Sequence, residues 1–150
     1  MDLRFGTKLA PGSKFPPFKL KATDGSVVDS KSLRGRYALL NFYFAACAPC
    51  IEEIPKLNEF SSRNKNFAMV AVTPDSTEET RKFAQKTSFG WTILADAEGL
   101  VKQAGVYGFP TFILLDASGD VVATGTSQDV WFFAGSLDRW ISNSIAKQAK

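Results

Sequence analysis

The sequence predicts an α/β fold in which helices flank a central mixed β-sheet, and three observations support this. After Gly35, strand-like apolar runs alternate with segments whose apolar residues recur at helical spacing. The run from Tyr37 to Phe44 is almost unbroken in its apolar character, which is typical of a strand covered on both faces. The chain has 150 residues, of which 45% are apolar and 22% charged, and this suffices for one core. We therefore expect residues 1–150 to form a single domain.

The first elements lie outside this alternating region. Residues 1–17 contain three prolines, and we expect them to form an irregular lead-in. Asp24-Gly25 lies between two short runs, Phe18–Leu20 and Ser26–Val28, and an Asp-Gly pair is typical of a hairpin turn. The sequence therefore predicts a β-hairpin extension at the N-terminal side of the sheet.

The strands of the central sheet are expected where β-branched and aromatic residues cluster between turn residues. They are Ala38–Phe44, Phe67–Thr73, Thr92–Leu94, Thr111–Leu115 and Val121–Gly125. Residues 116–120 form a turn sequence that would join the last two strands as a second hairpin.

Helices are expected at Ala48–Asn64, Ser76–Ser88, Leu100–Ala104 and Gln128–Ala146. In the last helix, one apolar stripe at a spacing of three and four residues predicts the face that packs on the sheet. Its members are Val130, Phe133, Leu137, Ile141 and Ile145. Trp131 and Phe132 lie off this stripe, either as packing at its rim, which we favour, or as a surface for a partner.

Composition excludes several classes of function. The net charge is only +3, and lysines and arginines are scattered, so we expect no nucleic-acid partner. The chain has no histidine, which removes histidine-dependent catalysis and leaves a metal shared between two subunits as the remaining zinc hypothesis. No apolar stretch reaches the ~18 residues of a membrane span, and residues 1–4 are not typical of a secretory signal. Any signal or anchor would therefore lie outside this sequence.

Cys47 and Cys50 are the two cysteines of the chain, and they lie where the buried strand should turn into a helix. The unpaired N–H groups and the dipole of a helix N-terminus favour a thiolate over a thiol. Pro49 suits the first turn of a helix, where an N–H would be unpaired. The motif therefore predicts a reactive thiol.

Three segments carry a family resemblance: Asn-Phe-Tyr-Phe-Ala-Ala-Cys-Ala-Pro-Cys at 41–50, Glu-Ile-Pro at 53–55, and Gly-Val-Tyr-Gly-Phe-Pro-Thr-Phe at 105–112. With them, the chain resembles the TlpA-type (ResA- and DsbE-like) thiol-disulfide oxidoreductases of the thioredoxin fold over about residues 15–146. The resemblance implies a thioredoxin-like fold with a redox-active disulfide. Cys47, with an exposed sulfur, would attack a substrate disulfide, and the partly covered Cys50 would resolve the mixed disulfide.

The resemblance also implies roles outside the cysteine pair. The Phe109–Pro110 bond would be cis, with Pro110 packed against the disulfide and the Phe109 backbone free to pair with an extended substrate. Glu53 would exchange a proton with Cys50; alternatively, it is an acidic residue that the helix dipole favours in the first turns. Asn41 stands where cytoplasmic thioredoxins have a buried Asp, which leaves the proton-transfer role to Glu53.

Two residues depart from the family pattern. The family usually has Trp immediately before the first cysteine, where this chain has Ala46, and Tyr43 replaces a second aromatic residue that is usually Trp. The substrate surface, for which we name Ala46, Phe109 and Pro110, should therefore differ, with Phe44 and Phe109 supplying apolar cover.

Three functions are compatible with these residues. The first is a disulfide exchange enzyme that reduces rather than oxidises protein disulfides, although dipeptide identity is a weak guide to direction. The second is a peroxiredoxin, which residues 72–76 resemble; Leu40 and Phe44, however, stand where a peroxide site needs Pro and Thr. The third is a binding module with a structural disulfide, but so short a closed loop would contribute little stability.

The favoured enzyme would act on protein thiols and disulfides and would receive electrons from an upstream thiol protein. We expect a monomer that needs neither a cofactor nor a resident metal. TlpA-type domains work outside the cytoplasm, so we expect the periplasm or the extracytoplasmic face, with the cytoplasm as the alternative.

Overall fold

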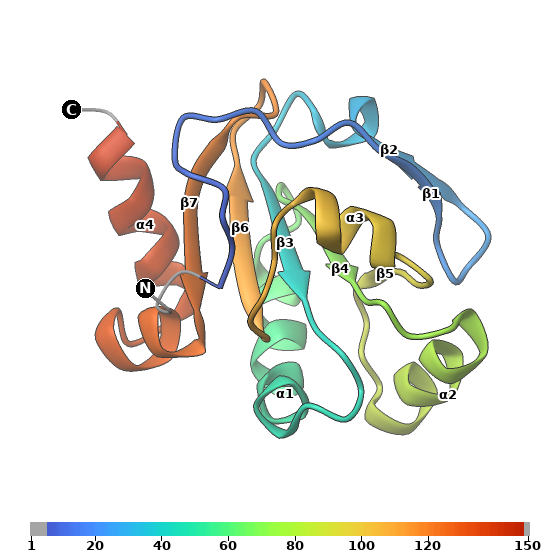
Figure 1. Cartoon of the computed structure of the whole chain (residues 1–150). Coiled ribbons are helices and arrows are strands. Elements are labelled where there is room, and N and C mark those ends of the chain that lie inside the picture. Colours follow the sequence, from blue (N-terminus) through green and yellow to red (C-terminus); the bar gives the residue numbers. More distant parts are fainter. Residues whose placement is uncertain (1–5, 149–150) are drawn as a thin grey trace.

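The computed structural model describes residues 6–148, which form a central sheet with helices on both faces (Figure 1). The sheet has the strand order β5-β4-β3-β6-β7. Its strands are β3 (Ala38–Phe42), β4 (Ala68–Val72), β5 (Thr92–Leu94), β6 (Thr111–Leu115) and β7 (Val121–Thr126). β3 is parallel to β4 and antiparallel to β6, so the predicted mixed sheet is confirmed.

The strands lie close to their predicted bounds. β5 and β6 match them, and the ends of the other three strands differ by one or two residues. The N-terminal hairpin is also confirmed: β1 (Lys19–Lys21) pairs antiparallel with β2 (Val27–Asp29), with Leu20 opposite Val28. Ala22 continues from β1 into an isolated bridge with Leu94, so the hairpin joins the β5 side of the molecule.

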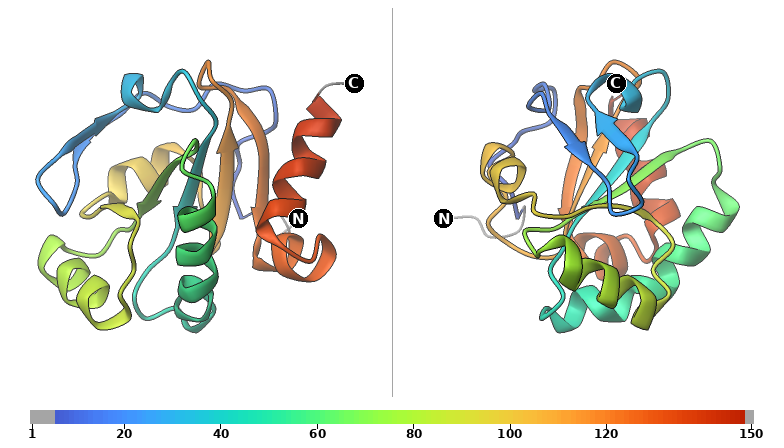
Figure 2. Two further views of the ribbon diagram at one scale, coloured as in Figure 1. Left: turned by 180° about the vertical axis from the view of Figure 1, so that it is seen from behind. Right: turned by 90° about the vertical axis from the view of Figure 1, so that its right-hand side faces the viewer.

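The helices are α1 (Ala48–Arg63), α2 (Thr77–Thr87), α3 (Glu98–Gln103) and α4 (Leu137–Gln148). A short 3-10 helix, η2 (Lys31–Leu33), follows the hairpin, and a π-helical turn, η3 (Gln128–Phe133), follows β7. α1 and α4 cover one face of the sheet, which the view from behind shows in front (Figure 2), whereas α3 and the hairpin cover the other.

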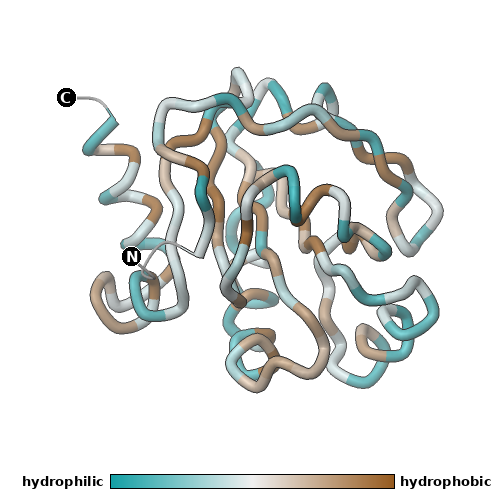
Figure 3. Tube along the Cα trace, viewed as in Figure 1, coloured by the Kyte–Doolittle hydropathy of each residue, from teal (hydrophilic) through white to brown (hydrophobic). Residues whose placement is uncertain are grey.

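The buried apolar residues form two clusters, one on each face of the sheet. Alternate residues of β3 belong to different clusters: Leu40 and Phe42 pack with α3, and Leu39 packs with α1 and α4. This explains why the sequence of β3 is apolar almost throughout, and the strands are accordingly among the most hydrophobic segments of the trace (Figure 3).

The predicted last helix, Gln128–Ala146, is wrong as a single element, because the chain forms η3, bends, and begins α4 only at Leu137. Gly135 has a φ of +93°, in the left-handed region, which ends the helical geometry. Ser136 then accepts a hydrogen bond from the Arg139 N–H at its Oγ, over 3.1 Å, as a helix cap does.

This bend also corrects the predicted apolar stripe. Phe133 is not a core residue but is 68% exposed, because η3 carries it away from the face that α4 packs on the sheet. Val130, Leu137 and Ile141 are buried as predicted, and Ile145 is partly buried. Phe132 is 74% exposed, so it does not pack at a rim.

The part of the lead-in that the structure describes, residues 6–17, has no strand longer than an isolated bridge. Thr7 bridges to Val106 and Lys14 to Asp120, so the segment crosses the molecule beside the loops that precede β6 and β7. Residues 1–5 of the predicted lead-in lie outside the described residues. Within residues 6–148, the helices are too short or too polar to cross a membrane.

Gly125 provides a test of how tightly α4 packs on β7. A Cβ at this position would lie 3.0 Å from Cζ2 and Nε1 of the buried Trp140 indole, which has little room to move. Gly125→Ala should therefore lower the free energy of unfolding by about 1–3 kcal/mol in urea denaturation. The control is Gly99→Ala on α3, where a Cβ would meet no atom within 4 Å. That change should leave stability unchanged or raise it by up to ~1 kcal/mol; equal losses in both variants would contradict the packing.

Candidate active site

Cys47 caps the N-terminus of α1, as the sequence predicts. Its backbone is extended, with φ −89° and ψ 108°, and α1 begins at the next residue. The Cys50 N–H donates to Sγ of Cys47 over 3.3 Å. This N–H would otherwise be one of the unpaired donors of the helix start, so the contact favours negative charge on the Cys47 sulfur.

Cys47 and Cys50 form a disulfide, with their Cα atoms 5.3 Å apart across the first turn of α1. We expected an exposed first sulfur, but Cys47 is only 7% exposed and Cys50 only 3%. Both residues belong to the apolar cluster beneath α1, which covers the disulfide and explains the difference. The neighbours Ala46 and Pro49 are exposed, so the approach to the disulfide runs past these two residues.

The loop before α1 and the loop before β6 leave the sheet at the same end. Phe42, the last residue of β3, pairs with Thr111, the first residue of β6. Just beyond this pair, the rings of Phe44 and Phe109 make an edge-to-face contact, with their centroids 5.2 Å apart. The Phe109–Pro110 peptide bond is cis, as the family resemblance implies, and Pro110 is buried.

Glu53 lies one turn after Cys50 on the buried side of α1 and is only 4% exposed. Its Oε1 accepts two hydrogen bonds from the segment around η3: Oγ of Ser127 donates over 2.5 Å, and Nε1 of Trp131 donates over 2.7 Å. Oε2 is buried and has no hydrogen-bond partner among the described residues. Glu53 is therefore not a surface residue of the helix, whereas the exposed Glu52 fits the alternative of an acidic residue that the helix dipole favours.

Burial raises the pKa of Glu53 from 4.5 to about 7, against the opposing effect of the two hydrogen bonds and of the Lys56 charge. A carboxyl with such a pKa can both accept and donate a proton near neutral pH. The structure thus places a buried carboxyl with a pKa near neutrality on the same helix face as the two cysteines.

Sequence reasoning missed the partners of Glu53. Trp131 is partly buried, as expected for a residue at a rim, but its indole also binds the carboxyl, and Nζ of Lys56 lies 4.8 Å from its ring centroid. The sequence did not indicate a function for Ser127. No local signal could have found either contact, because Ser127 and Trp131 are 74 and 78 residues from Glu53 along the chain.

Other buried polar groups lie on β3 and just after it, where the chain leads to the site. Asn41 on β3 is 2% exposed, and its Nδ2 has no partner among the described residues; the same holds for the hydroxyl of Tyr43. Burial raises the pKa of Tyr43 above its usual range, and the negative charge of Asp75 adds to this effect. Residues 6–148 contain no cluster of three or more His, Cys, Asp or Glu that could hold a metal ion.

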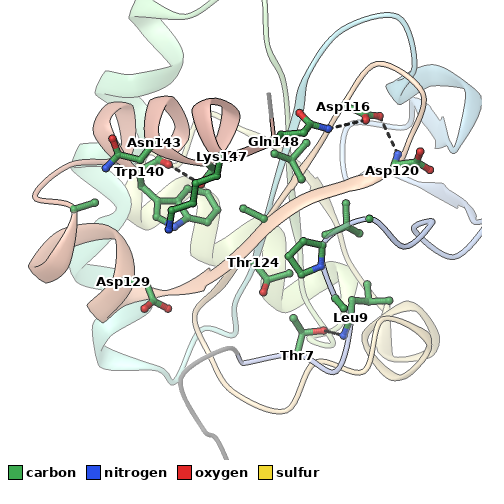
Figure 4. Close-up of a pocket in the computed structure, with 18 of the residues that line it drawn as sticks. Thr7, Leu9, Asp116, Asp120, Thr124, Asp129, Trp140, Asn143, Lys147 and Gln148 are labelled. Carbon is green, nitrogen blue, oxygen red and sulfur yellow. Dashed lines mark hydrogen bonds between the residues drawn. The ribbon is translucent and has the colours of Figure 1, made fainter. Parts of the chain in front are cut away.

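A groove of about 880 Å³ runs between the lead-in, β7 and α4 (Figure 4). Its walls include Thr7, Leu9, Thr124, Trp140 and Lys147. Neither the cysteines nor Glu53 line this groove, so it is separate from the thiol site.

Comparisons with known proteins agree with this geometry. A sequence model of the family described as Redoxin matches residues 10–132. The thiol-disulfide oxidoreductase ResA of Geobacillus thermodenitrificans is 32% identical over 126 residues, which cover 80% of this chain and 72% of that protein.

Two solved structures have a similar fold. The thioredoxin domain of a thiol-disulfide oxidoreductase from Bacteroides vulgatus is 28% identical with a TM-score of 0.70, over 78% of this chain and 89% of that chain. A provisionally assigned thiol:disulfide interchange protein DsbE from Chlorobium tepidum is 27% identical with a TM-score of 0.80, over 92% and 99%.

The buried Glu53 should make the oxidised protein less stable as the pH rises. Its pKa is about 7 in the folded protein and has the ordinary value of 4.5 in the unfolded chain, so folding favours the protonated form. This contribution is fully present below pH 4.5 and is lost as the pH rises through about 7. At about 1.4 kcal/mol per pKa unit, the loss should reach about 3 kcal/mol by pH 8, measured by urea denaturation.

The chain has no histidine, so no other type of side chain in it has its ordinary pKa between 5 and 8. A change in stability across this pH range can therefore be assigned to Glu53. Glu53→Gln is the control: its stability should stay nearly constant from pH 5 to pH 8. A wild-type curve as flat as that of the variant would show that the carboxyl does not titrate as the structure indicates.

Proposed function

The chain belongs to the Redoxin family and is a TlpA-type thiol-disulfide oxidoreductase, and we propose that it reduces protein disulfides with Cys47 as nucleophile and Cys50 as resolving thiol. One arrangement carries this proposal: a disulfide closed across the first turn of α1, with a buried carboxyl one turn further along. The helix N-terminus favours a thiolate at Cys47, and Glu53 supplies the proton acceptor that Cys50 needs.

The reaction begins with the reduced protein. The Cys47 thiolate attacks one sulfur of the substrate disulfide; the other substrate sulfur leaves as a thiolate and takes a proton from water, and a mixed disulfide forms. Cys50 then transfers its thiol proton to Oε2 of Glu53, and the resulting thiolate attacks Sγ of Cys47. The bond from Cys47 to the substrate breaks, the second substrate thiolate leaves, and the Cys47–Cys50 disulfide remains.

Two electrons pass to the substrate in this cycle, so a second partner must return them. We assign this role to an upstream protein dithiol, which would reduce the Cys47–Cys50 disulfide by the same exchange in reverse. Glu53 would then give its proton back to the Cys50 sulfur. A pKa of about 7 suits a group that accepts a proton in one half of the cycle and donates it in the other.

Substrates would dock beside the disulfide on Ala46, Phe109 and Pro110. Ala46 is exposed next to Cys47, and Phe109 is partly exposed with its ring against Phe44. An extended substrate would pair with the Phe109 backbone as an added strand. The small Ala46 would leave room for a bulkier substrate segment than the Trp that the family usually has at this position.

We further propose that the protein acts as a single-domain monomer outside the cytoplasm. The family resemblance supports this location, because TlpA-type domains work there. A lone Cys-X-X-Cys pair is also the usual cysteine content of such domains.

The assignment of the nucleophile can be tested by trapping. Cys50→Ser removes the resolving thiol, so Cys47 should stay joined to a substrate in a mixed disulfide, seen as a reducible adduct by mass spectrometry. Cys47→Ser is the matched control and should trap little or nothing. Trapping by Cys47→Ser instead of Cys50→Ser would reverse the two roles.

The role of Glu53 can be tested on the reduced protein by alkylation with iodoacetamide. Above pH 7 the Glu53 carboxylate disfavours a second negative charge on the nearby thiols. Glu53→Gln should therefore move the alkylation profile of the Cys47/Cys50 pair to lower pH, as a coupled titration. Glu52→Gln, which changes the exposed neighbour, should leave the profile in place. Identical profiles for wild type and Glu53→Gln would remove Glu53 from the mechanism.

A further inference from the structure

We propose that Trp131 is a positioning residue for the thiol-disulfide exchange: its indole N–H holds Oε1 of Glu53 and leaves Oε2 as the oxygen that receives the proton of Cys50. This inference rests on the role proposed above for Glu53 and names the residue that sets the geometry of its carboxyl. It assigns a function to η3, a segment that the sequence did not connect to the cysteines.

The two oxygens of the Glu53 carboxyl have different surroundings. Oε1 accepts from Trp131 over 2.7 Å and from Ser127 over 2.5 Å, whereas Oε2 is buried with no partner among the described residues. A carboxyl oxygen whose lone pairs already accept two hydrogen bonds is a poor place for an incoming proton. The proton must therefore arrive at Oε2 and leave from it.

The shape of η3 places both donors at Glu53. The Ala134 N–H donates to the Asp129 carbonyl over 3.0 Å, five residues back, which is the hydrogen bond of a π-helical turn. Oδ2 of Asp129 accepts from the N–H and the hydroxyl of Thr126, over 2.8 and 3.0 Å, and so ties η3 to the end of β7. This frame brings Ser127 and Trp131 to the same oxygen. Turns of this kind frequently occur at functional sites.

The Trp131 indole is held in its orientation by neighbouring side chains. Its ring contacts two groups: Nζ of Lys56 is 4.8 Å from its centroid, and the buried Phe112 ring makes an edge contact with centroids 6.3 Å apart. These contacts fix the ring plane and with it the direction of the N–H. The positive charge of Lys56 also lowers the pKa of Glu53, whereas the Asp129 carboxylate accepts a hydrogen bond from the Thr126 N–H.

The oxidised protein allows a direct test, because Cys47 and Cys50 do not titrate while they form the disulfide. The carboxyl carbon of Glu53 is followed by NMR from pH 4 to pH 9. Trp131→Phe keeps a ring but removes the donor that favours the charged carboxylate, so the midpoint should rise by about one pH unit above that of wild type. The matched control is Trp91→Phe, which removes an indole hydrogen bond to the Leu57 carbonyl of the same helix. The Glu53 midpoint should not move in that control.

A second readout needs no variant. In the wild-type protein, the Nε1–H resonance of Trp131 should shift with the same midpoint as the Glu53 carboxyl, because the donor senses the charge of its acceptor. In turnover, substrate release from the mixed disulfide should depend on pH with a midpoint that is higher in Trp131→Phe than in wild type. The increase should equal the change in the NMR midpoint of the Glu53 carboxyl. A flat Trp131 resonance, or unchanged midpoint and profile in Trp131→Phe, would overturn the inference.

The outcomes separate this inference from the proposed function. If Glu53→Gln changes the release profile but Trp131→Phe behaves like wild type, Glu53 keeps its role and Trp131 only packs. If Glu53→Gln leaves the release profile unchanged, the proposed role of Glu53 fails, and the inference about Trp131 fails with it.

Discussion

The start of helix α1 at Cys47 is the constraint on which the rest of the site depends. Because α1 begins at the next residue, Cys50 lies one turn along the helix, and its N–H reaches the Cys47 sulfur over 3.3 Å. Glu53 lies one further turn along, on the same face, which is the face that packs on the sheet. The spacing of three residues thus lines up the proposed nucleophile, the proposed resolving thiol and a buried carboxyl. A start of α1 one residue earlier or later would break this order.

The same burial that covers the disulfide gives the carboxyl its chemistry. A carboxyl in the apolar cluster beneath α1 holds a proton near neutral pH, and the two donors from Ser127 and Trp131 limit that effect. The pKa of Glu53 therefore reflects two opposing effects: burial against the sheet raises it, and the hydrogen bonds from the segment around η3 lower it. Next to the covered disulfide, Ala46 and Pro49 are exposed, and we propose that substrates approach on this side.

The sequence predicted the elements that a local pattern determines. The bounds of β5 and β6, the hairpin at Asp24-Gly25 and the start of α1 at Ala48 agree with the structure, because turn residues and apolar runs define them. The predicted last helix does not agree with the structure. The apolar periodicity of 3.6 residues continues across Gly135, but the helical backbone is interrupted there. The Gly135-Ser136 pair, a left-handed glycine followed by a helix cap, was the available signal. The site was predictable within α1, but the contacts of Glu53 span more than 70 residues and depend on tertiary packing.

The reduction potential of the Cys47–Cys50 disulfide, measured by equilibration with glutathione buffers at pH 7, tests the central claim most directly. A reductant that receives electrons from a dithiol protein should have a potential close to the roughly −270 mV of thioredoxin, with a reversible two-electron equilibrium. A potential near −120 mV, typical of strong protein oxidants, would contradict the proposed direction. A disulfide that does not equilibrate with glutathione at all would contradict its role as the redox centre.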